Sequence, residues 1–167
     1  DVQRSRTEIF TTENRKMAEN TAAQSFVLLK NNNILPLKKT GTIALVGPLA
    51  NNVENMTGTW SVAADFSKSI SVLSGLQTAV GSNAKVVYAK GANLDEDTLF
   101  EQRAGMFGKA FVHDNRPPQQ IIDEALAVAN ESDVIVAALG ESAEMTGESS
   151  SRSNIEIPQV QKDLLAA

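Results

Sequence analysis

The sequence predicts an α/β protein, a three-layer α/β/α sandwich around a mostly parallel sheet. Three short apolar runs rich in β-branched residues, at 42–46, 85–89 and 133–139, are each followed by a glycine, as in buried parallel strands that end in loops. Helical patterns of apolar residues separate the runs, which gives the order βαβαβ. The chain has 167 residues, 42% of them apolar, and is long enough to bury one hydrophobic core.

Three helices with regular patterns are expected before the last strand. A lead-in helix is predicted over residues 12–30, with Thr11 or Thr12 as its cap, and Pro36 blocks any continuation. The two helices between the strands are predicted at 71–80 and 118–130. The second carries its apolar side chains on one face, at Ile121, Ile122, Ala125, Leu126 and Ala129.

The rest of the chain is less regular. Residues 93–116 combine mixed charge with scattered aromatics, and we expect an excursion outside the sheet with a short helix of its own. A polar loop, 141–156, leads to a last helix that begins at Pro158 and reaches Ala167. A doubly wound sheet normally continues past such a helix, so the sheet is expected to be truncated at its C-terminal end.

Charge and composition exclude several classes of function. With 20 acidic and 15 basic side chains the net charge is −5, and no basic stripe is present, which argues against nucleic acid or an anionic membrane as a partner. The absence of cysteine removes disulfides, thiolate metal sites and cysteine nucleophiles. No apolar run approaches the roughly 20 residues that span a bilayer, and residues 1–10 lack the apolar core of a signal peptide, so no membrane insertion is expected.

Ligands of open α/β sheets bind beyond the carboxyl ends of the strands, so the strand-end loops are the places to search. The first loop, beginning at Gly47 and Pro48, lacks both glycine-rich phosphate-binding patterns, which disfavours a nucleotide and predicts a tight turn. The loop after the third strand gathers Glu141, Glu144, Glu148 and Arg152.

Two interpretations of this acidic loop stay open. Its carboxylates suit general acid or base catalysis, with the arginine holding one of them ionised or binding a substrate oxygen. Alternatively, the loop is a solvated acidic surface.

The loop has no histidine and no calcium-type spacing, so no metal and no cofactor are expected. His113, the single histidine, is distant in sequence from any strand-end serine, and residues 140–144 miss the last glycine of G-x-S-x-G, which disfavours a serine hydrolase.

Trp60, the single tryptophan, lies downstream of the first strand-end loop. An indole on a loop at a strand end could pack against the face of a sugar. The alternative is a place in the core or in an interface, which is the usual environment of an aromatic side chain.

Taken in order, these segments resemble glycoside hydrolase family 3, in particular its bacterial periplasmic β-glucosidases. No segment is decisive alone, but their order and spacing are specific from about residue 17 onward. The matching segments are SFVLLKN at 25–31, LPL at 35–37, IALVGPLA at 43–50, GTWS at 58–61, YAKGAN at 88–93, DVIV at 133–136, GE at 140–141, ESSSR at 148–152 and IPQ at 157–159.

The resemblance implies a retaining, exo-acting β-glucosidase that hydrolyses terminal non-reducing β-D-glucosyl residues with two carboxyl groups. It implies that residues 1–37 are a connecting segment with the lead-in helix, and that 38–167 are part of the second, sandwich domain. It further implies a catalytic (β/α)8-like barrel that carries the nucleophile, and we expect these residues to contain no part of it. The isolated chain is therefore expected to be inactive. The partners that the resemblance implies are a β-glucoside or oligosaccharide substrate and the barrel domain of the same parent protein.

The resemblance also implies roles for single residues. Glu148 occupies the position of the acid/base, with Arg152 and Pro158 at matching offsets. Because Ser149 and Ser151 replace the glycine and aspartate of the commoner motif, Glu144 is the reserve candidate. Trp60 corresponds to an aromatic beside the aglycone subsite, and Trp60 and Arg152 are the predicted substrate-binding residues.

The resemblance places the parent protein in the periplasm or outside the cell. The first alternative is a non-catalytic carbohydrate-binding or scaffold module. A nucleotide-binding Rossmann-like domain is the second, weakened by the missing glycine loop.

Overall fold

The computed structural model describes residues 4, 7–61, 64–104, 112–145, 147–148 and 150–167. The chain divides into two compact units, Asp1–Lys38 and Lys39–Ala167. The roles predicted for the two parts of the chain, a connecting segment and a partial sandwich domain, stay predictions.

The first unit contains helix α2, Thr12–Ser25, which begins where the sequence predicts. The Thr11 hydroxyl caps it by accepting a hydrogen bond from the Asn14 N–H at 3.1 Å. The helix ends at Ser25, five residues before the predicted end, because Phe26 has an extended backbone (φ −72°, ψ 135°). The predicted end at residue 30 was wrong. No residue of α2 is buried, so another helical turn would gain no burial to offset the cost of ordering it.

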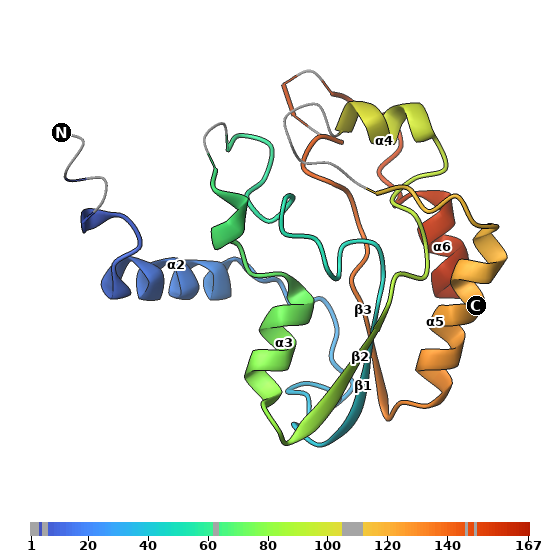
Figure 1. The fold of residues 1–167 in the computed structure, drawn as a ribbon, viewed down its shortest axis with the longest axis horizontal. Coiled ribbons are helices and arrows are strands. Elements are labelled where there is room, and N and C mark those ends of the chain that lie inside the picture. The colour runs from blue at the N-terminus through green and yellow to red at the C-terminus, as the bar shows by residue number, and fades with distance from the viewer. Residues whose placement is uncertain (1–3, 5–6, 62–63, 105–111, 146, 149) are drawn as a thin grey trace. The chain divides into compact units, whose positions relative to one another are not determined.

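The sheet of the second unit has three parallel strands, β1 Gly41–Val46, β2 Ala84–Ala89 and β3 Val134–Ala137 (Figure 1). Their order is β2-β1-β3, and Val46 at the end of β1 lies opposite Ala89 and Ala137. The parallel α/β class is therefore confirmed. The third strand is shorter than predicted because its partner β1 ends at Val46. The next residue, Gly47, has φ +115° and packs against Ala138, where a Cβ would lie 2.3 Å from the carbonyl oxygen.

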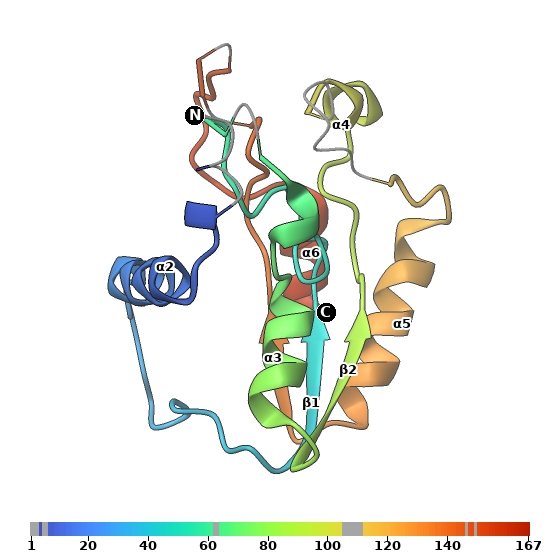
Figure 2. The same ribbon diagram turned by 60° about the vertical axis from the view of Figure 1, so that its left-hand side comes forward.

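Helices cover both faces of this sheet (Figures 1 and 2). Helix α3, Val72–Val80, lies on one face, and α5, Pro118–Asn130, and α6, Gln159–Ala166, lie on the other. The three-layer arrangement matches the prediction. The core between the sheet and the layer of α5 and α6 contains the buried side chains Val46, Ala89, Ala92, Ile122, Ala125 and Leu164.

Two short helices lie outside the layers. The excursion contains α4, Thr98–Ala104, as predicted, and the Asp97 carboxylate caps it by accepting from the Leu99 N–H at 2.9 Å. A 3-10 turn, η1 Phe66–Lys68, was not predicted.

The order of the strands creates a switch point in the sheet. Because β1 lies between β2 and β3, the chain passes from β1 to β2 on one side and later returns to β3 on the other side. This order makes the carboxyl ends of β1 and β3 the switch point of the sheet, where open α/β folds bind ligands.

Candidate active site

The loops that follow β1 and β3 are joined directly at this switch point. The Asn55 side-chain oxygen accepts a hydrogen bond from the Ala143 N–H at 2.8 Å. The Asn52 carboxamide oxygen in turn accepts from the Asn55 N–H at 2.9 Å and from its side-chain nitrogen at 2.8 Å. The Thr59 hydroxyl lies 3.4 Å from the Glu144 carboxylate. Segments that are more than 80 residues apart in sequence thus form one surface.

The first loop begins with the tight turn that the sequence predicts. The Ala50 N–H donates to the Gly47 carbonyl at 3.2 Å, and the Ala50 carbonyl accepts from the Leu73 N–H at 2.9 Å, in the first turn of α3. Ala50 is fully buried. These bonds direct the rest of the loop toward the end of β3.

Glu148 is exposed at the tip of a turn in the second loop. Residues 147 and 150 form an antiparallel bridge, and the Ser150 N–H donates to the Gly147 carbonyl at 3.3 Å. The Ser150 hydroxyl donates to the Glu144 carbonyl at 2.9 Å. Gly147 packs so closely on the first loop that a Cβ there would lie 2.8 Å from the Thr59 hydroxyl oxygen. Backbone contacts therefore hold the turn while the Glu148 carboxylate faces outward; its neighbour Ser149 lies outside the described residues.

Glu144, the reserve candidate, has a different environment. It is half-buried, and its carboxylate lies against Thr59 inside the joint between the two loops. Of the two glutamates, Glu148 is the more accessible to a ligand above the loop surface.

Arg152 interacts with neither of these glutamates in the contacts that the structure describes. It forms an ion pair with Glu141 and donates to the Glu156 carbonyl at 3.0 Å. Its guanidinium also approaches the sulfur of the buried Met145 at 4.0 Å. The carboxylate that pairs with this cation is therefore Glu141, at the start of the loop, and the contacts of Arg152 connect parts of the same loop.

Trp60 is 70% exposed. The interpretation of this side chain as part of the core was therefore wrong within this chain, because the loop carries it away from the packed layers. Its exposure leaves the indole face available to a ligand or to another domain.

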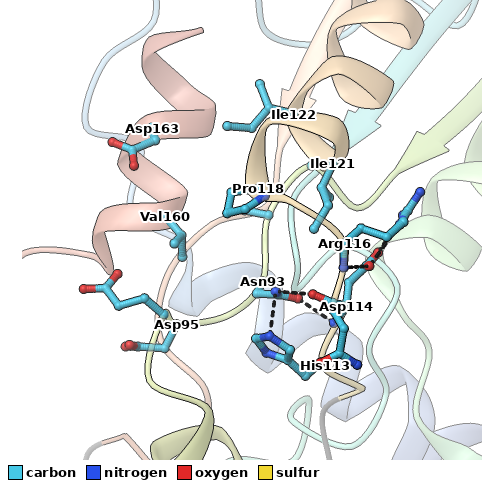
Figure 3. A pocket seen from close by; sticks show the side chains of 14 residues that line it. Asn93, Asp95, His113, Asp114, Arg116, Pro118, Ile121, Ile122, Val160 and Asp163 are labelled. Atoms are coloured by element: carbon cyan, nitrogen blue, oxygen red, sulfur yellow. Dashed lines mark hydrogen bonds and ion pairs between the residues drawn. The ribbon is translucent and has the colours of Figure 1, made fainter.

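A second group of polar residues was missed by the sequence analysis. Beyond β2, a pocket of about 230 Å³ lies among the loop after this strand, the segment before α5, and the first turns of α5 and α6 (Figure 3). Asn93 and Asp114 bridge it with two reciprocal hydrogen bonds of 2.9 Å. Asp95 and Asp163 lie on one side of the pocket, opposite Asp114 and Arg116. Hydrogen bonds from Arg116 lower the pKa of Asp114 to about 2.

The network behind this pocket is structural. The Glu101 carboxylate is buried, accepts from the Leu94 N–H at 3.0 Å and from the Asp95 N–H at 3.2 Å, and pairs with His113. Lys90 donates to the Asn93 side-chain oxygen at 2.6 Å and to the Val112 carbonyl at 2.8 Å, and burial lowers its pKa. A glutamate and a histidine 12 residues apart form no recognisable motif, so the sequence contained no signal for this pair.

Among the described residues, no three or more histidine or acidic side chains are grouped so that they could hold a metal ion. No helix in the described part of the chain has the length and hydropathy needed to cross a bilayer.

Comparison with known proteins places this chain in a family. Residues 26–167 match the model of the glycosyl hydrolase family 3 C-terminal domain. A periplasmic β-glucosidase of Salmonella typhimurium is 49% identical over 154 residues, which cover 92% of this chain and 20% of the relative. A β-xylosidase of Formosa agariphila is 32% identical, covering 94% of this chain and 20% of the relative.

Solved structures agree with the sequence relatives. A β-glucosidase from Listeria innocua in complex with glucose superposes with a TM-score of 0.71 at 31% identity, covering 95% of this chain and 19% of that protein. An exo-β-xylosidase with a bound xylobiose aziridine probe superposes with a TM-score of 0.66 at 29% identity. The chain thus spans about one fifth of the length of these relatives.

Proposed function

The chain belongs to glycosyl hydrolase family 3, whose C-terminal domain it matches, and on this premise we propose that it supplies the general acid/base of a retaining, exo-acting β-glucosidase. The substrate would be a terminal, non-reducing β-D-glucosyl residue. The 49% identity to a periplasmic β-glucosidase, against 32% to a β-xylosidase, supports glucose as the sugar and the periplasm as the location.

The observation that carries the proposal is the position of Glu148. An acid/base of a two-domain active site must reach a sugar held by another part of the protein, so its carboxylate must project from the domain while its backbone is held. The turn at 147–150 meets both requirements, because the bridge, Ser150 and the contact with Thr59 fix the backbone and leave Glu148 exposed.

The proposal assigns the other half of the reaction to another part of the parent protein. Retaining hydrolysis needs two carboxyl groups about 5 Å apart, on opposite sides of the scissile bond. We assign the nucleophile to a barrel domain outside this chain, so the isolated chain should not hydrolyse aryl β-glucosides. Trp60, exposed on the loop joined to that of Glu148, would border the aglycone.

The test is Glu148→Ala in the intact enzyme. Cleavage of cellobiose, whose leaving group needs a proton, should be almost abolished. With a dinitrophenyl glucoside the first step should persist and the glycosyl-enzyme should accumulate as a burst. Azide needs no general base, and it should restore turnover with the β-glycosyl azide as product.

Two further variants make the test specific. Glu131→Ala, at the C-terminal end of α5 and so near the amino end of β3, removes another exposed carboxylate and should stay within about twofold of wild type. Glu144→Ala should show no azide rescue. If the burst and the rescue appear in Glu144→Ala and not in Glu148→Ala, the acid/base is Glu144.

A further inference from the structure

Gln161 is a fully buried polar side chain that the sequence analysis did not select. It lies in the first turn of α6 with 0% of its surface exposed. Its side-chain nitrogen donates to the Leu94 carbonyl at 2.7 Å and to the Gly140 carbonyl at 2.9 Å. Its side-chain oxygen accepts from the Gly140 N–H at 2.9 Å. Both donor hydrogens and the acceptor of the amide are therefore in use.

The two partners of Gln161 belong to different strand-end loops. Leu94, itself buried, follows β2, and Gly140 lies three residues after the end of β3, at the start of the loop that carries Glu148. Gly140 is held through both its N–H and its carbonyl, which fixes the orientation of its peptide planes and not only its distance from α6. A helix side chain thus sets the direction in which the acid/base loop departs from the sheet.

We propose that Gln161 is a positioning residue for the acid/base, acting through Gly140 on the loop that carries Glu148. This inference rests on the function proposed above for Glu148. Gln161 is too deeply buried to touch a substrate. Its effect on catalysis is therefore geometric: it holds the root of the loop, and the joint of Asn55 with Ala143 holds the loop further along.

The contacts require an amide of this length. Methionine has a similar volume but would leave the Gly140 N–H and two carbonyls without partners. A glutamate carboxylate would place acceptors against the Leu94 and Gly140 carbonyl oxygens. Asparagine keeps the amide and is one methylene too short to reach both loops. Each substitution therefore removes some or all of the hydrogen bonds that hold Gly140, and each does so for a different chemical reason.

The experiment compares leaving groups in the intact enzyme. An acid that is displaced by a fraction of an ångström should affect substrates in proportion to their need for a proton, because proton transfer depends steeply on geometry. For Gln161→Met we expect kcat/KM for cellobiose to fall at least about tenfold more than kcat/KM for the dinitrophenyl glucoside. Gln161→Asn and Gln161→Glu should shift the same ratio in the same direction.

Leu164→Ala is the matched control for loss of stability. Leu164 lies on the same helix and packs in the core beside Gly91, and it takes no part in the hydrogen bonds that Gln161 forms with Gly140. It should lower the melting temperature and leave the leaving-group ratio within about twofold of wild type at a temperature where the variant is folded. A ratio unchanged in all three Gln161 variants, or changed equally in Leu164→Ala, would overturn the inference.

A double variant separates this inference from the proposed function. In the Glu148→Ala background, Gln161→Met should leave the ratio unchanged, because the acid that it positions is gone. If Glu148→Ala shows neither burst nor azide rescue, the proposed function fails. If Glu148→Ala behaves as proposed and the Gln161 variants keep the wild-type ratio, only the positioning role fails.

Discussion

Gly147→Ala tests whether the close packing between the loops after β1 and β3 sets the position of Glu148. A Cβ built there lies 2.8 Å from the Thr59 hydroxyl oxygen and 3.2 Å from its methyl carbon, whereas ordinary contacts begin near 3.4 Å. In Gly147→Ala the turn that carries Glu148 must therefore retreat by roughly half an ångström. Since a misplacement of about 1 Å can cost about 10²-fold in rate, we expect kcat/KM for cellobiose to fall about tenfold, or about 1.4 kcal/mol.

The assay is a double-mutant cycle in the intact enzyme. Thr59→Ala removes both close atoms and leaves the Thr59 Cβ at 3.5 Å, an ordinary contact. Relative to Thr59→Ala alone, adding Gly147→Ala should then cost no more than about threefold, a coupling of the size found between residues in contact. Cellobiose should be affected more than a dinitrophenyl glucoside, because the displaced carboxylate, Glu148, is the one that we propose as the acid. Equal losses in the presence and absence of Thr59→Ala would refute the steric reasoning.

Three further predictions concern the aglycone, the core and the pH dependence of stability. Trp60→Ala should lower kcat/KM for disaccharides more than for substrates with small leaving groups, and should leave the thermal unfolding midpoint unchanged because the indole is 70% exposed. Gly91→Ala should lower the free energy of urea unfolding by about 2–4 kcal/mol, since a φ of +72° is unfavourable for alanine and the new Cβ would lie 2.7 Å from Leu164. The control is Gly58→Ala, which has a similar φ of +73° but open space around the new Cβ, and it should lower this free energy by only about 1–2 kcal/mol. Arg116 lowers the folded-state pKa of Asp114 from 3.8 to about 2, so the Asp114 carboxylate stabilises the fold fully above pH 4 and loses this effect as the pH falls toward 2. In Asp114→Asn the urea concentration at the unfolding midpoint should therefore change less with pH between 4 and 2 than in the wild type.

The fold class could be predicted from the sequence because its signals are local. The run before Gly47 is apolar and β-branched since β1 is the central strand and is buried on both faces, and the apolar face of α5 covers that strand and β2. The end of α2 could not be predicted, because the helical pattern of the sequence continues to residue 30, whereas the backbone becomes extended at Phe26. The end of β3 depends on its partner β1, which ends at Val46, before the positive φ of Gly47.

The candidate acid/base could be selected from its place in a family motif, but its surroundings could not. Arg152 has the right spacing to serve Glu148, and in the structure it pairs with Glu141. Gln161 is one polar residue in a polar helix by sequence, and only its three hydrogen bonds to Leu94 and Gly140 distinguish it.

The sequence by itself determined the alternation of strands and helices, the burial of the central strand and the family motif around Glu148, because each depends on residues that are near neighbours along the chain. Only the tertiary structure decided that β3 pairs with β1, that Asn55 and Thr59 bond to the loop that carries Glu148, and that Trp60 is exposed. These features depend on contacts between residues up to about 90 positions apart, and such contacts are set by strand order and packing, which no local pattern encodes.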